Sequence, residues 1–384
     1  PLHTVQFPLS GADDMSKLAL DGLLVIALEH AVAGPYCSRL LVEGGARVIK
    51  LERAEGDFAR AYDKLVKGDS AYFVWLNGGK ESIVVDLKTG ADRILLHNLL
   101  RRADVFIQNL RPGAVDRLGF GYGAVREINR NLVMCSISGY GQSGEYAQMK
   151  AYDTLIQAET GLGSVTGLPG QPCKVGASVV DIATGLTAYG EILKALIKRG
   201  RDGHGAHIDL SLFEVMAEWM AVPLSSYEYG DKLLGGTGFD HAHIAPCGAY
   251  ETADGPIIIV VQNEREWTQL CRDVLEVPEL VDDERYKENV RRVENKDALR
   301  VDIEAYFKRF SRAEMAAKLQ QGGIAFGNLN DMSDLQRHPA LKRKTVETSS
   351  NEVSLVRRAG DVAEGLPRVP NLDEHGATIR AEFY

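Results

Sequence analysis

Cysteine is scarce in this sequence, and long apolar runs are missing. The five cysteines are widely spaced, form an odd number and include no Cys-x-x-Cys pair. This argues against a disulfide scaffold or a structural zinc site. No stretch approaches the roughly 20 consecutive apolar residues that a membrane-spanning helix needs. We therefore expect a cytoplasmic protein with reduced thiols and no membrane partner.

Positive charge is also in deficit. The 44 Lys and Arg residues are outnumbered by 53 Asp and Glu, which gives a formal net charge of −9. Binding to nucleic acid needs clustered excess Lys and Arg, so that partner is not expected. Residues 1–14 lack the basic and apolar regions of a signal peptide, and we interpret them as an expression leader or a disordered arm.

The motifs of common nucleotide and hydrolase sites are absent as well. The first predicted strand-to-helix turn, His30-Ala-Val-Ala-Gly-Pro35, has one glycine, whereas a dinucleotide site needs Gly-x-Gly-x-x-Gly. The chain has no Gly-Lys-Ser/Thr phosphate loop and no Gly-x-Ser-x-Gly nucleophile elbow. These absences exclude three large classes of α/β enzyme.

The sequence does contain a regular alternation of β-rich and helical segments. Such consecutive βα units predict an α/β fold with a mostly parallel sheet, in which ligands bind at the carboxyl ends of the strands. The predicted strands cover residues 23–28, 47–51, 82–87, 105–110 and 132–138, and the helices between them cover 34–44, 89–102 and 123–129.

The length of 384 residues and a change of composition near residue 235 predict two domains. Residues 15–234 are expected to form the large domain, 235–323 a smaller α+β domain, and 324–384 a segment that returns to the large domain. Further elements are predicted as a helix at 181–198, a strand at 206–212, a long helix at 213–229, a linker at 235–238, a hairpin of strands 249–252 and 257–261, and helices at 264–275, 296–309 and 312–320.

Residues 150–185 hold the candidate catalytic side chains. Tyr152, Asp153 and Asp181 flank a glycine-rich connection that is too apolar for an ordinary solvated loop. An acid at a helix start, such as Asp181, is commonly a cap for the first backbone N–H groups. The alternative is a carboxylate nucleophile, which needs partial desolvation and nearby N–H donors. The segment alone leaves both interpretations open.

A second cluster, Asp240-His241-x-His243, has two interpretations as well. Two imidazoles and a carboxylate suit zinc, but no third His or Cys ligand follows nearby. The alternative is a segment of the small domain that closes over the active site. We predict no metal.

Several motifs occur in a fixed order along almost the whole chain from Leu20. They are Leu20-Asp-Gly-Leu-Leu-Val25, His30 to Pro35, Gly45 to Arg53, Asn77 to Lys88, Ala103 to Asn109, Arg111 to Gly119, Ser138 to Gly144, Tyr152-Asp153, Gly161 to Gly167 and Asp181. Together they resemble the class III CoA-transferases, a family that includes formyl-CoA transferase, carnitine CoA-transferase and the α-methylacyl-CoA racemases. The resemblance implies a Rossmann-like large domain and a small domain in each of two chains that interlock like links.

The resemblance also implies roles for individual residues. Asp181 matches the catalytic aspartate, His30 a residue beside the CoA thioester, and Tyr152 with Asp153 the pair next to the nucleophile. The positions that match the CoA-binding residues are His30, Ala31, Arg53, Val85, Lys88, Asn109, Leu110, Arg117 and Lys150. Taken singly, each Arg or Lys is better explained as a solvated surface charge, and only the set of them indicates a binding site. The alternative for His30 is a core or turn histidine bonded to a backbone carbonyl, but its place at the first strand end favours a functional role.

The implied reaction moves CoA from an acyl-CoA, for example succinyl-CoA, to a small carboxylic acid through aspartyl-anhydride and aspartyl-CoA thioester intermediates. Coenzyme A is then a substrate, and no permanently bound cofactor is expected. We expect a dicarboxylate acceptor such as itaconate, mesaconate or citramalate, with Arg60 as a partner for its distal carboxylate. Backbone amides of Gly235 to Gly238 are the expected oxyanion donors.

Two other functions remain open from the sequence: an acyl-CoA racemase on the same fold, and a nucleotide-binding module without chemistry. The racemase branch that this chain resembles takes one base from the His of a Gly-His-Asp triplet, where this sequence has Ala151-Tyr152-Asp153. Phenols ordinarily have a pKa near 10 and are poor bases at neutral pH. A mere binder has no need of Asp181 in its apolar setting. The transferase is therefore the predicted function.

Overall fold

The structure, a computed structural model, describes residues 18–361 and 368–384, so the predicted leader at residues 1–14 lies outside the described residues. The chain forms two compact units. The first comprises the described residues of Pro1–Thr160, Gly176–Trp219 and Lys342–Tyr384, and the second comprises Gly161–Val175 and Met220–Leu341. These bounds differ from the predicted ranges, because residues 161–175 and 220–234 belong to the second unit and that unit continues to Leu341.

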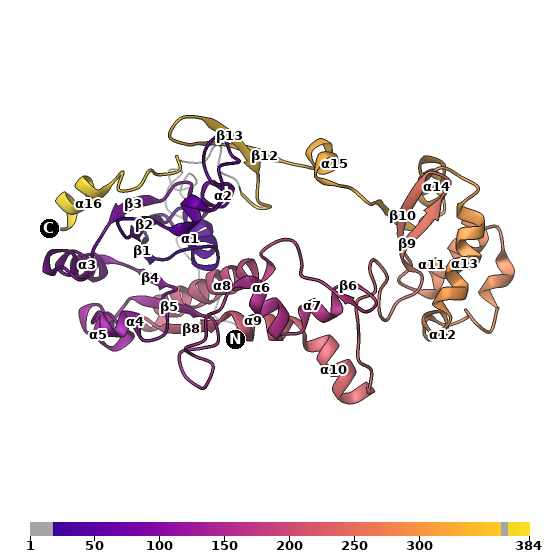
Figure 1. The fold of residues 1–384 in the computed structure, drawn as a ribbon, viewed down its shortest axis with the longest axis horizontal. Coiled ribbons are helices and arrows are strands. Elements are labelled where there is room, and N and C mark those ends of the chain that lie inside the picture. Colours follow the sequence, from indigo (N-terminus) through magenta and orange to yellow (C-terminus); the bar gives the residue numbers. More distant parts are fainter. Residues whose placement is uncertain (1–17, 362–367) are drawn as a thin grey trace, which may run out of the picture. The chain divides into compact units, whose positions relative to one another are not determined.

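A six-stranded parallel sheet forms the centre of the first unit (Figure 1). Its order is β3-β2-β1-β4-β5-β8, and every neighbouring pair is parallel. The strands are β1 (Leu24–Leu28), β2 (Arg47–Glu52), β3 (Glu81–Val84), β4 (Val105–Gln108), β5 (Val133–Ser138) and β8 (His207–Ser211). The prediction of an α/β fold with a parallel sheet is confirmed.

The order of the strands reverses beside β1. From β1 the chain adds β2 and β3 on one side, and then β4, β5 and β8 on the other. In a parallel sheet such a reversal leaves a crevice at the carboxyl ends of the two strands where it occurs, here β1 and β4. His30 lies two residues beyond β1 and Asn109 directly follows β4, so the topology brings these two side chains to one crevice.

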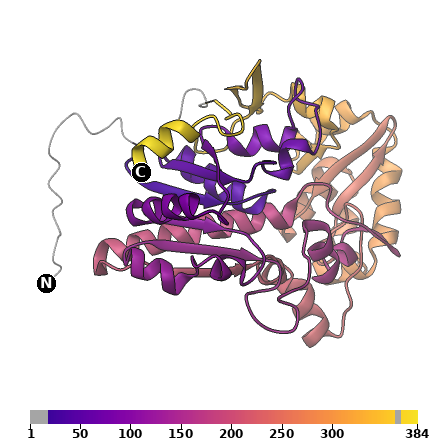
Figure 2. The same cartoon turned by 60° about the vertical axis from the view of Figure 1, so that its left-hand side comes forward.

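Helices cover both faces of this sheet (Figure 2). One face packs against α3, α5 and the C-terminal α16, whose Ile379 and Phe383 share a core with Ile26 and Phe106. The other face carries α1 and the long α8. The helices of the first unit are α1 (Ala33–Glu43), α2 (Ala71–Asn77), α3 (Gly90–Arg102), α4 (Ala114–Arg117), α5 (Tyr122–Ile128), α6 (Asp153–Glu159), α8 (Val179–Asp202), α9 (Leu212–Trp219), α16 (Gly376–Phe383) and the 3-10 helix η1 (Phe58–Ala61).

A glycine in α8 sets its distance from α1. A Cβ atom built on Gly185 would lie 2.6 Å from the backbone oxygen of Ala33, and the two helices therefore touch through their backbones. Asp181 lies one turn before Gly185. The hairpin β12 (Arg343–Glu347) and β13 (Glu352–Val356) completes the first unit.

The second unit has its own core, in which Trp267, Tyr286 and Phe307 are buried. Its antiparallel sheet has the order β11-β10-β9, and a short hairpin, β6 with β7, lies apart from that sheet. Its elements are α7 (Leu162–Val165), β6 (Gly167–Leu168), β7 (Gln171–Pro172), α10 (Ala221–Gly230), β9 (Cys247–Thr252), β10 (Gly255–Val260), α11 (Glu264–Gln269), η2 (Leu270–Val274), η3 (Pro278–Val281), α12 (Asn289–Glu294), α13 (Lys296–Phe307), α14 (Arg312–Gln321), β11 (Ala325–Asn328) and α15 (Met332–Arg337).

Two predicted helices are wrong in detail. The helix expected at 213–229 is interrupted at Met220, between α9 and α10. Pro223 explains the break, because proline clashes with the carbonyl four residues before it and has no N–H to donate. The helix expected at 264–275 changes to π-helical turns from Leu270. Among the described residues, no helix is both long and apolar enough to cross a bilayer.

Candidate active site

Two cavities open at the carboxyl edge of the sheet in the first unit. The first has a volume of about 380 Å³ and is lined by the turn after β1, the residues after β4 and the start of α8. The second has a volume of about 370 Å³ and lies at the ends of β2 and β3. Both volumes suit a small ligand. His30, Phe58 and Leu110 line both cavities, so the two adjoin at these side chains.

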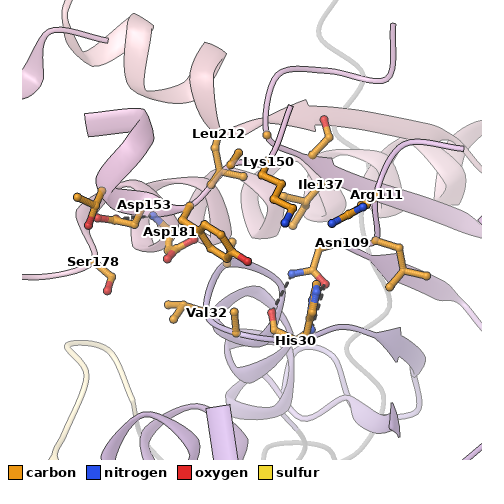
Figure 3. A pocket seen from close by; sticks show the side chains of 18 of the residues that line it. His30, Val32, Asn109, Arg111, Ile137, Lys150, Asp153, Ser178, Asp181 and Leu212 are labelled. Atoms are coloured by element: carbon orange, nitrogen blue, oxygen red, sulfur yellow. Dashed lines mark hydrogen bonds between the residues drawn. The ribbon is translucent and has the colours of Figure 1, made fainter. Parts of the chain in front are cut away.

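Asn109 holds His30 by three hydrogen bonds. Its side-chain oxygen accepts from the His30 backbone N–H and from the ring Nδ1–H, each at 3.0 Å, and its amide group donates to the His30 carbonyl at 2.8 Å (Figure 3). Burial lowers the pKa of His30, so the ring is neutral at pH 7 and Nε2 carries the lone pair. The side chain of Asn109 is therefore committed to fixing His30.

The residue after His30 is held from the other side. Ala31 has a φ of 63°, in the left-handed region that non-glycine residues seldom adopt. Its backbone N–H donates to the buried carboxylate of Asp57 at 3.1 Å. Asp57 also binds the Lys50 ammonium at 2.9 Å, and both side chains are fully shielded from solvent. The turn after β1 is thus attached to a buried ion pair.

Asp181 and Asp153 lie next to one another at the start of α8 (Figure 3). The Asp153 carboxylate accepts from the backbone N–H of Val180 at 2.8 Å and from that of Asp181 at 3.3 Å, so Asp153 caps the helix. Gln157 donates to the other oxygen of Asp153 at 2.6 Å. Burial and the nearby Asp153 carboxylate raise the pKa of Asp181 to about 7. Of the two interpretations of Asp181, capping belongs instead to Asp153.

Two cations line the first cavity on the side of Asn109. Lys150 and Arg111 point toward it (Figure 3), and within the described chain neither side chain has an ion-pair or hydrogen-bond partner. Unpaired cations in a protein of net charge −9 are suited to bind a phosphate or a carboxylate.

The structure distributes the remaining predicted site residues between the cavities. Tyr152, Asp153, Asp181, Ala31 and Lys150 line the first cavity. Arg53, Val85 and Lys88 line the second. Arg117 lines neither and is exposed, although its neighbour Leu118 reaches the second cavity.

Arg60 does not have the environment expected of a substrate ligand. Its guanidinium binds the buried Glu52 carboxylate at 2.7 Å, lies 3.8 Å from the centre of the Phe73 ring, and lines neither of the two cavities. The expectation that Arg60 binds a distal carboxylate is therefore wrong: its charge is already neutralised.

The other two predicted motifs lie in the second unit. Asp240 binds Arg300 at 2.5 Å, and the backbone N–H of His243 donates to His241 Nδ1 at 3.0 Å, so both groups have partners within the protein. Gly238 N–H donates to the carbonyl of Gly167 at 2.7 Å. That backbone amides of Gly235 to Gly238 donate to an oxyanion remains a prediction. That the protein binds no metal also remains a prediction.

Several residues that line the first cavity are not among the site residues predicted from the sequence. Phe58, Tyr62 and Tyr72 form one wall, and the Tyr72 hydroxyl lies 3.0 Å from Ser178 Oγ. Burial, with the nearby Asp57 and Asp181, raises the pKa of Tyr62 to about 12, so this hydroxyl stays protonated and can donate. Of these residues, Arg111 has the clearest signal in the sequence, because it directly follows the end of the predicted strand at 105–110.

Known proteins resemble this chain over nearly its whole length. Residues 20–363 match the family model "CoA-transferase family III". An acetyl-CoA:oxalate CoA-transferase of Acetobacter aceti is 37% identical over 96% of both chains, and a succinate–glutarate CoA-transferase of Agrobacterium fabrum is 33% identical over 96% of both. A solved CAIB/BAIF family protein from Brucella suis has 35% identity and a TM-score of 0.81, covering 96% of this chain and 100% of that one. The chain therefore belongs to CoA-transferase family III, and it is an enzyme that transfers CoA.

Proposed function

We propose that Asp181 is the nucleophile of this transferase and that each half of the reaction passes through a mixed anhydride. A carboxylate oxygen of Asp181 attacks the thioester carbonyl of the donor acyl-CoA, and the carbon–sulfur bond breaks to release CoA thiolate. The thiolate attacks the aspartyl carbonyl, which frees the donor acid and leaves an aspartyl-CoA thioester. The acceptor carboxylate then takes CoA by the same two steps in reverse order.

The observation that carries this proposal is the environment of the Asp181 carboxylate. It lines the first cavity, and no side chain or backbone N–H of the described residues donates a hydrogen bond to it. A carboxylate stripped of donors and raised in pKa is a stronger nucleophile than one in water. Asp153 holds the backbone of the same helical turn, which fixes the direction of attack.

The two adjoining cavities provide room for the two ends of an acyl-CoA. We assign the thioester to the first cavity, beside His30 and Asp181, and the nucleotide to the second. Arg53 and Lys88 at the second cavity, and Lys150 and Arg111 at the first, are exposed cations that suit the phosphates or a substrate carboxylate. CoA would bind as a substrate, with no permanent cofactor.

The acceptor we propose is a small dicarboxylic acid. This rests on the two relatives, whose names give oxalate and the succinate–glutarate pair as their acids. The assay gives the protein succinyl-CoA or acetyl-CoA with oxalate, glutarate, itaconate, mesaconate, citramalate, formate, carnitine and an aryl acid, and identifies the thioesters formed by mass spectrometry. Exclusive use of a monocarboxylic acid would overturn the assignment.

Hydroxylamine tests the covalent intermediate. Incubation with a donor acyl-CoA and hydroxylamine should convert Asp181 to a hydroxamate, found in the peptide containing that residue. Asp181→Ala should lose both the label and transfer, and Asp209→Ala, at a carboxylate that lines neither cavity, should keep both. Exchange of the α-proton of a 2-methylacyl-CoA at the rate of turnover, with no hydroxamate, would instead support the racemase.

We also propose an interlocked homodimer in the cytoplasm. Leu186 and Ile197 of α8 and Trp219 of α9 are more than half exposed in the single chain, which suits burial by a second copy. The five cysteines are free thiols, as in a reducing compartment. A folded monomer in sedimentation experiments at nanomolar concentration would contradict the dimer.

A further inference from the structure

Asp57 connects two parts of the site that are far from each other in the sequence. One carboxylate oxygen accepts from Ala31 N–H at 3.1 Å and from Ala59 N–H at 2.9 Å. The first of these belongs to the turn after β1, and the second to the 3-10 helix η1. The other oxygen accepts from Lys50 at 2.9 Å. Within the described residues, the hydrogen bonds to this buried carboxylate therefore join β2 to the turn after β1 and to η1.

Both parts held by Asp57 contact the candidate substrate cavities. The η1 helix contains Phe58, whose ring meets the His30 ring edge-on at a centroid distance of 4.9 Å. Phe58 and His30 line both cavities, and Ala31 lines the first. A displacement of Asp57 would thus move the backbone beside His30 and the aromatic ring on it together.

The conformation of Ala31 needs an external restraint. A left-handed φ at alanine is strained and persists only where surrounding contacts impose it. Asn109 fixes His30 on one side of this residue. Asp57 supplies the bond to Ala31 itself, and Lys50 holds Asp57 in place with a second contact to the carbonyl of Glu29 at 3.3 Å.

We infer that Asp57, held by Lys50, is a positioning residue for CoA transfer, which keeps the His30–Ala31 turn in its reactive orientation. The inference rests on the proposed place of this turn beside the thioester. A purely structural ion pair would affect stability but not the rate of the folded enzyme.

Two double variants separate these roles. Asp57→Asn with Lys50→Gln keeps an oxygen acceptor for Ala31 N–H, and Asp57→Leu with Lys50→Met has nearly the same shape but no acceptor. Both remove the same two buried charges and leave the buried Glu29–Lys80 pair in place, so their stabilities change for the same electrostatic reason. We expect kcat of the Leu/Met variant to fall about 100-fold, because a displacement near 1 Å has that effect, with a much smaller rise in KM for the acyl-CoA. The Asn/Gln variant should keep at least about a tenfold higher kcat than the Leu/Met variant.

Asp63→Leu is the matched control. Asp63 also accepts backbone N–H groups, from Leu65 at 2.9 Å and Ala71 at 3.0 Å, but it lines neither cavity. The Asp63→Leu substitution should lower the melting temperature and leave kcat unchanged. Equal kcat values for the two double variants, after correction for the folded fraction by circular dichroism, would overturn the inference.

A rescue experiment keeps the test decisive if the Leu/Met pair does not fold. Asp57→Ala also removes the acceptor for Ala31 N–H. Glycine adopts the conformation of residue 31 without strain, so Ala31→Gly should recover part of the kcat lost in Asp57→Ala. No recovery would overturn the inference. Absence of transfer by the unmodified protein would instead refute the proposed function, so the two failures are distinguishable.

Discussion

Replacement of Asp181 by asparagine should make the protein more stable at neutral pH while it removes transfer. The pKa of Asp181 is raised from 3.8 to about 7 by burial and by Asp153. Because the folded pKa lies above the unfolded one, the folded protein binds the extra proton between these values, and stability falls as the pH rises from about 4 to about 7. Below pH 4 the group is protonated in both states and contributes nothing.

The difference of about three pH units corresponds to about 4 kcal/mol, since each unit is worth about 1.4 kcal/mol. Asp181 lies at an open cavity and solvent reduces this value, so we expect Asp181→Asn to gain about 2–4 kcal/mol at pH 8. Asparagine has the same shape and carries no charge. The gain should shrink steadily as the pH is lowered and disappear near pH 4.

Thermal unfolding of both proteins at one scan rate, from pH 4 to pH 8, measures this difference. For a chain of this size we expect a rise of at least about 3 °C in the melting temperature at pH 8. Asp282→Asn, at an exposed carboxylate outside both cavities, is the control for the removal of one carboxylate. An Asp181→Asn variant no more stable than the parent at pH 8, or a gain independent of pH, would refute the reasoning.

Three further groups of variants have defined outcomes. The kcat/KM for acyl-CoA should rise with pH through a midpoint of about 7, where the Asp181 carboxyl loses its proton. Asp153→Asn should move that midpoint to lower pH, because it removes the negative charge beside Asp181. A pH–rate profile with an unchanged midpoint would contradict this. Gly185→Ala should lower both the melting temperature and kcat, because the new Cβ would lie 2.6 Å from the backbone oxygen of Ala33. In Gly190→Ala, in the same helix, the new Cβ would have no atom within 4 Å, so this variant should keep both values. Equal effects of the two substitutions would contradict the close contact between α8 and α1. Lys150→Ala and Arg111→Ala should each raise KM for acyl-CoA about tenfold through loss of a charge-assisted contact. Arg60→Met should lower the melting temperature, because it leaves the buried Glu52 carboxylate without its Arg60 partner, and should leave KM for the acceptor unchanged. The reverse pattern in steady-state kinetics would indicate that Arg60 binds the acceptor.

The parallel sheet could be predicted because each strand is a short apolar run and helical segments separate these runs in the sequence. His30 and Asn109 could be placed near the site because both follow strand ends. Their mutual hydrogen bonds could not be foreseen, since the two residues are 79 positions apart and topology alone brings them together. The break before α10 was within reach, as Pro223 is visible in the sequence and forbids a continuous helix.

The errors at charged residues have a common physical origin. Arg60 and Arg111 look alike in the sequence, but Glu52 neutralises the first and no described residue pairs with the second. Asp153 and Asp181 look alike too, yet Asp153 accepts backbone N–H groups, whereas no N–H group in the described part of the chain donates to the Asp181 carboxylate. Pairing of charges is decided in three dimensions, so a sequence pattern nominates the candidates without ranking them.

Because Asp153 caps α8, the orientation of Asp181 does not depend on the length of the chain segment between these two residues. The bonds from Val180 and Asp181 join residues 27 and 28 positions apart, and the segment between them includes residues 161–175 of the second unit. Even a doubling of such a loop adds only about 0.6 kcal/mol to its closure. The β6–β7 hairpin can therefore gain or lose residues over evolutionary time while the orientation of Asp181 stays the same.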